Sequence, residues 1–83
     1  MASVLEVSPN PFEGTITLSF NATTKSVVLL FNSIGQLEWQ GSFAVDQHFN
    51  TINTNALQAG IYFVQVLEAG KIVASEKVVK VAK

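Results

Sequence analysis

The sequence contains no cysteine in its 83 residues. This absence excludes disulfide bridges and thiolate metal sites, so packing alone must stabilise the folded state. Prolines are also few, at two, and charged residues make up only 13% of the chain. With 48% hydrophobic residues, the chain is apolar enough to bury a core and lacks the composition of a disordered segment. A chain of this length has room for one core, so we expect a single domain.

Two kinds of segment are also missing. No stretch is long and apolar enough for a membrane-spanning helix, and the first residues, MASVLEV, lack the basic and apolar parts of a secretory signal peptide. Helical periodicity is absent, because residues 42–59 are rich in Asn and Thr and show no apolar positions three and four apart. We expect one domain over residues 1–83, taken from a longer protein, with Met1 and Ala2 as the start of an expressed fragment.

Period-two alternation, in contrast, predicts strands along the whole chain. In residues 15–21, TITLSFN, apolar side chains alternate with Thr and Ser, as expected for a strand with one buried face. Further strands are expected at residues 4–7, 27–31, 36–43, 48–54, 61–68 and 71–81. Short strands with turn signals about every eight to twelve residues predict an all-β fold, a seven-stranded antiparallel β-sandwich.

The same alternation predicts which side chains form the core. These are Ile16, Leu18, Phe20, Leu37, Ile52, Leu57, Tyr62, Val64 and Val66. One strand, VVLLF, is apolar without interruption, so its periodicity does not show which face is buried. If Val27, Leu29 and Phe31 point outward together with Ile61 and Phe63, they form an apolar patch. A partner protein, or a second copy of the chain in a homodimer, should then cover this patch.

The stretch SPNPFEG, residues 8–14, precedes the first clear strand pattern. Proline fixes its own φ and disfavours helical backbone in the residue before it, so we expect an extended segment. Neither Pro9 nor Pro11 can donate a backbone hydrogen bond to a sheet, whereas the Asn10 side chain is free to bond a neighbouring backbone group. We expect this segment to interrupt strand pairing and to cross stiffly from one sheet to the other.

The stretch LQAGIY, residues 57–62, is the most specific local signal. A Leu, a Gly two residues before a Tyr and a following apolar strand resemble the tyrosine corner of immunoglobulin-like and fibronectin III-like sandwiches. In that corner the phenol hydroxyl bonds back to the backbone of the crossover. We therefore expect Tyr62 to be structural rather than a ring that stacks on a ligand.

Charge is nearly balanced overall, at −1, but it is unevenly distributed. Residues 71–83 carry four Lys and one Glu, whereas residues 1–70 carry one Lys and five acids. Lysines on a closing strand can protect a sheet edge against aggregation, or they can attract an acidic receptor that adds a strand to that edge. Both interpretations apply to Lys71, Lys77 and Lys80. Four lysines without interleaved aromatics do not predict nucleic-acid binding.

Candidate catalytic groups are scarce. His48 is the only histidine, and Asp46 could share its strand face, but no nucleophile and orienting group accompany them. The six acids are scattered without metal-ligand spacing, and the five glycines form no phosphate-binding pattern. The sequence therefore predicts no enzyme activity, no cofactor and no metal site.

Four landmarks in order carry a resemblance to a known family. They are PNPF followed by Gly14, FNSIGQL at residues 31–37, LQAGIYFVQV at residues 57–66 and the closing GKIVASEKVVKVAK. With these the chain resembles, nearly end to end, the type A C-terminal sorting domains of proteins that Bacteroidota export through the type IX secretion system. Gln36 stands where the family usually has a basic residue, and Phe31-Asn32 where it usually has Tyr-Asp.

The resemblance implies a non-catalytic signal that directs a cargo protein across the outer membrane, without stable membrane insertion. Its expected partners are the type IX machinery and a sortase-like surface protease that cuts upstream of the PNP segment. The domain would pass through the periplasm and reach the cell surface or the medium. Val28 and Leu30 would face the core. The motif residues expected to take part in recognition are Pro9, Asn10, Pro11, Gly14, Gly35, Leu57, Gly60, Tyr62, Lys71, Lys77 and Lys80.

A second hypothesis is a fibronectin-like carbohydrate-binding or adhesive module of the kind appended to secreted enzymes. Trp39, Phe43 and Phe49 would supply a platform of rings, although the alternation of Trp39 with Leu37 favours a half-buried Trp39. Coplanar exposed rings on one face would favour sugar binding. Rings turned inward would favour the sorting signal.

Overall fold

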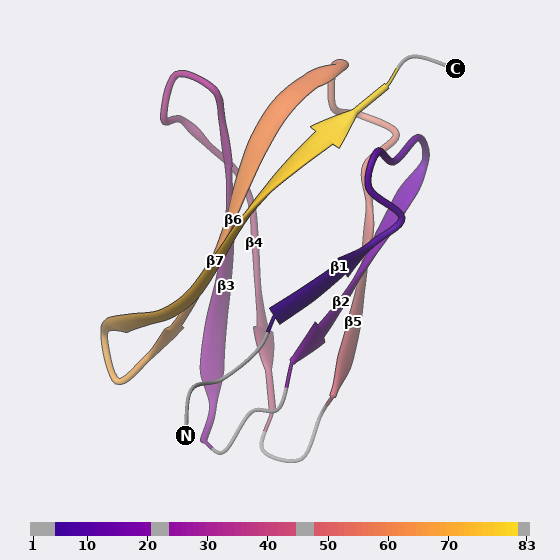
Figure 1. Ribbon diagram of the computed structural model, residues 1–83. Helices are drawn as coiled ribbons and strands as arrows, with labels where there is room; N and C mark the ends of the chain where they lie inside the picture. The colour runs from indigo at the N-terminus through magenta and orange to yellow at the C-terminus, as the bar shows by residue number, and fades with distance from the viewer. Residues whose placement is uncertain (1–4, 21–23, 45–47, 82–83) are drawn as a thin grey trace.

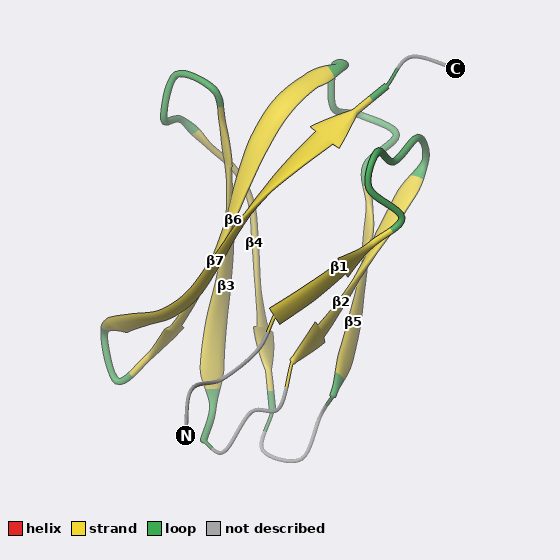
Figure 2. Ribbon diagram, viewed as in Figure 1, coloured by secondary structure: helices red, strands yellow, loops and turns green. Residues whose placement is uncertain are grey.

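The computed structural model describes residues 5–20, 24–44 and 48–81, which are drawn in colour in Figure 1. All regular structure in these ranges is β-strand, and they hold no helix long and apolar enough to cross a membrane (Figure 2). The strands are β1 (Leu5–Ser8), β2 (Thr15–Phe20), β3 (Ser26–Asn32), β4 (Leu37–Phe43), β5 (Phe49–Asn53), β6 (Gly60–Glu68) and β7 (Lys71–Lys80). Their ends agree with the predicted strands to within one residue.

Two antiparallel sheets form a sandwich, as the strand spacing predicts. One sheet has three strands in the order β1-β2-β5, and the other has four in the order β4-β3-β6-β7. Figure 1 shows the two sheets as separate layers that face each other. The fold class is therefore confirmed as an all-β, seven-stranded antiparallel sandwich, consistent with an immunoglobulin-like fold.

The core lies between the sheets and follows the alternation of the strands. On β2, Ile16, Leu18 and Phe20 are buried, and on β3 the buried apolar residues are Val28 and Leu30, as expected. Among the described residues, the buried apolar side chains are Leu5, Phe12, Ile16, Leu18, Phe20, Val28, Leu30, Phe43, Ile52, Tyr62, Val64, Val66 and Val78. Burial of a large apolar side chain contributes about 1.5–3 kcal/mol. This packing takes the place of disulfides.

Leu37 does not lie in the core, contrary to the prediction, since 49% of its surface is exposed. A β-bulge explains the difference. Leu30 pairs with Trp39 and Phe31 pairs with Leu37, so Glu38 is an extra residue in β4. The extra residue breaks the alternation that linked Leu37 to Trp39, and Leu37 turns to the outer side of the sheet. Trp39 packs half-buried against the core, as expected.

The segment between β1 and β2 does not cross between the sheets, contrary to the prediction. β1 and β2 are antiparallel neighbours in the three-stranded sheet. The connecting residues bend instead of running extended, and the peptide bonds before Pro9 and Pro11 are cis. Proline restricts the backbone locally but does not set the direction in which the chain leaves, so the sequence did not reveal this return. The segment does interrupt strand pairing, as expected.

Candidate recognition site

The motif-bearing loops and strand ends meet at one end of the sandwich, at the top of Figure 1. We name this region the signature end. It comprises residues 9–14, 32–36, 54–62 and 77–81. All the predicted motif residues lie here except Lys71, which begins β7 at the opposite end.

The PNPF segment pairs with the end of β7 and covers part of its edge. Phe12 N donates to Val79 O and Val81 N donates to Phe12 O, both at 2.9 Å, in a short parallel bridge. The Asn10 side chain continues this pairing. Its Oδ1 accepts from Val79 N at 3.0 Å, and its Nδ2 donates to Lys77 O at 3.4 Å. Asn10 therefore bonds neighbouring backbone, as expected.

Lys80 is buried, with 8% of its surface exposed, although an exposed recognition lysine was predicted. Alternation along β7 explains its position, because Val78 and Lys80 share the inward face of the strand. The ammonium group donates to the carbonyl oxygen of Thr54 and, at 2.7 Å, to that of Leu57. These carbonyl dipoles offset the loss of hydration on burial. Lys80 is thus occupied within the fold and ties β7 to the segment between β5 and β6.

Thr54 joins the same segment to the loop that follows PNPF. Its N and its Oγ1 each donate to the carbonyl oxygen of Gly14 at 2.9 Å. In the described ranges, no buried side-chain nitrogen or oxygen lacks a hydrogen-bond partner. Leu57 is half-buried against the core, and Gly60 begins β6 opposite Lys80. These motif residues therefore serve the packing of the signature end.

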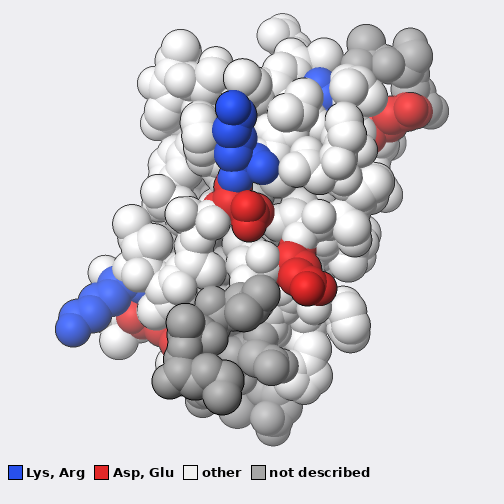
Figure 3. Space-filling view, viewed as in Figure 1, with Lys and Arg blue, Asp and Glu red and all other residues white. Residues whose placement is uncertain are grey.

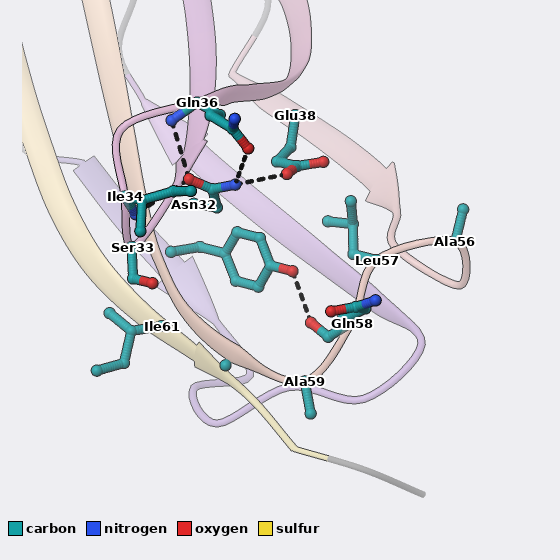
Figure 4. Close-up of a pocket in the computed structure, with 12 residues that line it drawn as sticks. Asn32, Ser33, Ile34, Gln36, Glu38, Ala56, Leu57, Gln58, Ala59 and Ile61 are labelled. Atoms are coloured by element: carbon teal, nitrogen blue, oxygen red, sulfur yellow. Dashed lines mark hydrogen bonds between the residues drawn. The ribbon is translucent and has the colours of Figure 1, made fainter.

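Tyr62 makes the contact that the tyrosine corner predicts. Its hydroxyl donates to Gln58 O at 2.6 Å, the dashed line that ends beside the Gln58 label in Figure 4. Its ring is buried. The ring centroid lies 6.4 Å from that of Phe12 in a tilted arrangement typical of aromatic pairs. Burial, and to a lesser extent the negative charge of Glu38, raises the pKa of the Tyr62 hydroxyl above its usual value of 10.0. Both effects favour the neutral phenol, which is the form that donates this hydrogen bond.

The turn between β3 and β4 is organised by the Asn32 side chain. Its Oδ1 accepts hydrogen bonds from Ile34 N at 3.1 Å and Gln36 N at 2.9 Å, as in an Asx turn. Its Nδ2 donates to Gln36 Oε1 at 3.1 Å and to Glu38 Oε2 at 2.8 Å. Gly35 has a φ of +86°, which glycine adopts without a steric penalty. The motif residue Gly35 therefore shapes this turn.

An open groove of about 460 Å³ lies between this turn and the residues that follow β5 (Figure 4). Its polar side chains are largely bonded to neighbouring groups, Asn32 to Gln36 and Glu38, and Tyr62 to the backbone of Gln58. Of the described residues that line it, Glu38 is the one carboxylate and none is a histidine. The groove therefore offers neither an acid–base pair nor a set of metal ligands.

The other two lysines of β7 differ from Lys80, since both are exposed. Lys77 lies opposite Phe63 of β6, so it projects on the outer side of the four-stranded sheet. Lys71 lies opposite Glu68 at the far end of the strand. Figure 3 shows few charged side chains on the side in view, where groups of opposite sign lie close together. Lys71 and Lys77 are the lysines of this strand that a partner can reach.

The three rings of the carbohydrate hypothesis do not form a platform. Phe43 is fully buried, 5.9 Å from Phe20 between ring centroids. Trp39 folds over its own strand, where a Cβ on Gly41 would lie 2.3 Å from the indole ring. Phe49 is 66% exposed, but it belongs to the other sheet. These positions give no support to a sugar-binding module.

Candidate catalytic residues are not brought together either. His48 is exposed at the start of the β5 region, and Asp46 lies outside the described residues. Within residues 5–20, 24–44 and 48–81, no three His, Asp or Glu side chains lie close enough to hold a metal ion.

Sequence reasoning missed several residues that build the signature end. Phe12 is fully buried, and its only signal was a large apolar residue between the prolines and the Glu-Gly turn. The burial of Lys80 was implied by its alternation with Val78, since one strand face carries both. Asn32 and Thr54 gave no distinctive signal, because polar residues beside turns are common and their partners are distant in sequence.

Comparison with known families agrees with this arrangement. The chain matches the family described as the secretion system C-terminal sorting domain over residues 6–81. A comparison with curated proteins gave no significant match. The matched range extends from β1 through β7 and includes all four segments of the signature end. Because it covers nearly the whole chain, the protein belongs to the secretion system C-terminal sorting domain family, whose members are C-terminal signals for type IX secretion.

Proposed function

We propose that the secretion machinery recognises this sorting signal by binding β7, through Lys71, Lys77 and the part of the strand edge that no other backbone pairs. The observation that carries the proposal is the division among the lysines of β7. Lys80 is buried and bonded, whereas Lys71 and Lys77 are exposed. Glu76 is also exposed on this strand, so Lys71, Lys77 and Glu76 leave a net charge of +1. This excess of positive charge favours an acidic receptor, because complementary charge speeds the encounter and fixes the register.

The backbone of β7 supports the same proposal. As the last strand of the four-stranded sheet, β7 has one edge that no strand of that sheet pairs. Phe12 and Asn10 bond this edge between Lys77 and Val81, and among the described residues no such bonds reach it over residues 71–76. β1 contacts β7 but belongs to the other sheet, so an extended segment of a receptor could still pair with the backbone of residues 71–76, the open half of this edge. The alternative role of the lysines, protection of the edge from wrong partners, is compatible with this reading.

The route of the domain follows from its family. Export carries the cargo across the outer membrane to the cell surface or the extracellular space. We propose passage through the periplasm and later removal by a sortase-like surface protease upstream of Pro9. The hydrogen bonds of Asn10, Phe12 and Gly14 support this position, because a cut before them leaves the signature end intact.

We also propose that the domain has no catalytic activity, cofactor or metal of its own, and that residues 1–83 form a single domain. The scattered acids and the exposed single histidine support this view, since acid–base or nucleophilic chemistry needs groups held within hydrogen-bond reach of each other.

The test is export of a fluorescent reporter that carries an inner-membrane export signal at its N-terminus and this domain at its C-terminus. In a bacterium with type IX secretion, we expect the wild-type fusion at the cell surface or in the medium. The Lys71→Gln/Lys77→Gln variant should accumulate in the periplasm. Lys25→Gln is the matched control, because Lys25 is also exposed but precedes β3.

Two outcomes would contradict different parts of the proposal. Normal export of the Lys71→Gln/Lys77→Gln fusion would show that these lysines are not read. Retention of the wild-type fusion, under conditions in which another sorting domain exports the same reporter, would show that this domain is not a sufficient signal.

A further inference from the structure

The outer side of the four-stranded sheet is largely apolar along its two central strands. Three apolar side chains of β3 and three of β6 point away from the core there, alternating with the buried ones, and the polar Gln65 lies among them opposite Leu29. We name these six the apolar face: Val27, Leu29, Phe31, Ile61, Phe63 and Leu67. Val27 and Phe63 are each 40% exposed although the sandwich is complete. The flanking strands add Leu37 opposite Phe31 and Ile72 opposite Leu67.

The outer side of the other sheet is polar, so an apolar exterior is not a general property of this chain. On β2 and β5 the outward positions pair Thr15 with Asn53 and Thr17 with Thr51. The hydroxyls of Thr17 and Thr51 lie 3.2 Å apart and share a hydrogen bond. Hydroxyl and amide groups satisfy one another or water on such a surface, whereas on the four-stranded sheet the polar side chains Gln65 and Gln40 both lie in the row that crosses Leu29.

The outer side of the four-stranded sheet has dimensions close to those of a small protein interface. Four strands spaced about 4.8 Å apart and seven residues long, at about 3.3 Å per residue, span roughly 19 Å by 23 Å. That area, on the order of 450 Å², includes polar positions such as Gln40, Gln65 and Ser75, and it lies within the range of about 300–600 Å² of the largest apolar patches on monomers. It is below the roughly 600 Å² per partner of the smaller specific interfaces, so we expect a weak contact that depends on concentration.

The distribution of charge favours a particular occupant. The six side chains of the apolar face are uncharged, and Lys77 on β7 is the charged residue directly opposite one of them. In a two-fold symmetric contact, residues near the axis meet their own copies, so charges there would repel. Here the centre is neutral, and Lys77 lies on the edge strand. The net charge of −1 adds little repulsion between two copies.

We infer that the apolar face is a contact surface for a second copy of this chain. Two copies pack their four-stranded sheets face to face about 10 Å apart, as the layers of a β-sandwich do. Leu29 and Gln65 lie in the middle of the contact, and Val27, Phe31 and Phe63 pack around them. The Lys77 side chains lie at its rim. The open half of the β7 edge stays outside this contact.

The experiment is sedimentation equilibrium of the purified domain from micromolar to millimolar concentration. We expect a reversible monomer–dimer equilibrium, with NMR shifts on dilution confined to β3, β6 and their outer neighbours. Phe63→Thr should raise the dissociation constant of the dimer by roughly tenfold or more, because each dimer loses two apolar contacts. Val27→Thr, which keeps the β-branched shape and so preserves the strand, should also raise it.

Phe49→Thr is the matched control, since Phe49 is more exposed than Phe63 but lies on the polar sheet. Its dimer should be as tight as that of the wild type.

Three outcomes would each overturn the inference: equal weakening of the dimer by Phe49→Thr, a dimer that persists in the Val27→Thr/Phe63→Thr variant, or a wild type that stays monomeric at millimolar concentration. Loss of reporter export in Val27→Thr with a monomeric wild type would assign the face to another protein. Association of the isolated domain does not require the secretion machinery, so the result of this test does not depend on whether the machinery binds β7.

Discussion

The signature end and the apolar face differ in how far their side chains are already engaged. At the signature end, Phe12 is fully buried, the Lys80 ammonium is bonded to two carbonyls and the Tyr62 hydroxyl to a third. On the apolar face, Val27 and Phe63 remain 40% exposed. The residues that are easiest to recognise in the sequence are thus occupied in holding the fold.

This difference separates two ways in which a residue can matter for export. A change at a buried residue of the signature end should act through stability, because it removes contacts within the domain. A change on the apolar face or on the exposed lysines should act through binding and leave the fold largely intact. The largest effects on the free energy of unfolding are therefore expected at the signature end.

The largest loss is expected for Phe12→Ala. It removes a fully buried ring that packs against Tyr62, and such truncations cost about 3–5 kcal/mol. Urea denaturation followed by far-ultraviolet circular dichroism measures the change. Phe49→Ala is the control, because substitutions at exposed positions cost roughly 0.5 kcal/mol. Equal losses in the free energy of unfolding for the two variants would contradict the contrast between the buried signature end and the exposed surface.

A smaller loss is expected for Lys80→Met, which keeps an unbranched apolar stem and removes the ammonium group. The Leu57 carbonyl then loses its donor, and an unsatisfied buried group costs about 1–3 kcal/mol. Lys77→Met should cost at most about 1 kcal/mol, as expected for an exposed charge. The same denaturation measurement compares the two. If Lys80→Met is as stable as the wild type, desolvation of the ammonium cancels its hydrogen bonds.

Tyr62 gives a pH-dependent contribution to the same comparison. Its pKa is higher in the folded state than in the unfolded chain, so the unfolded chain loses the phenolic proton first. The corresponding stability is fully present below pH 10.0 and is lost as the pH rises through the folded-state pKa. Tyr62→Phe should abolish this component and cost about 1 kcal/mol at neutral pH through the lost hydrogen bond.

The sequence offers a direct measurement of this shift, because Tyr62 is its only tyrosine. Phenolate absorbance during an alkaline titration therefore reports one group. Glu38→Gln should lower the pKa in part, since burial is the larger cause and remains. A folded-state pKa at or below that of the urea-unfolded chain would contradict the assignment.

Sequence periodicity was sufficient for the strands and most of the core. It found Ile16, Leu18 and Phe20 because one face of a strand is buried and the period is two. It failed at Leu37, where one extra residue in β4 reverses the face. A bulge depends on pairing with another strand, so local alternation carries no sign of it.

The signature end was predictable in its motif residues, although not in Phe12, Asn32 and Thr54, and the roles of the motif residues were less predictable. The tyrosine corner gave the Tyr62 contact correctly, because that motif is local to residues 57–62. Asn10 and Lys80 act on partners far away in the sequence, at Val79 and at Leu57. Such contacts follow from how the sheets pack. Until that packing is known, a lysine is expected to be exposed.

The smallest effect on stability is expected for Lys77→Gln, and it tests the comparison most sharply. Lys77 is exposed on β7 only three residues from the buried Lys80, so the two positions share a strand and differ in burial. Gln keeps most of the length of the side chain and removes its charge, which should change stability by about 0–1 kcal/mol. Urea denaturation of the free domain and export of the reporter fusion should be measured on the same variants. We expect Lys77→Gln to lower export without a matching loss of stability, and Lys80→Gln to lower export only as far as it destabilises the domain. A single relation between export and stability that fits both variants would mean that the machinery responds to the folded domain rather than to its exposed lysine.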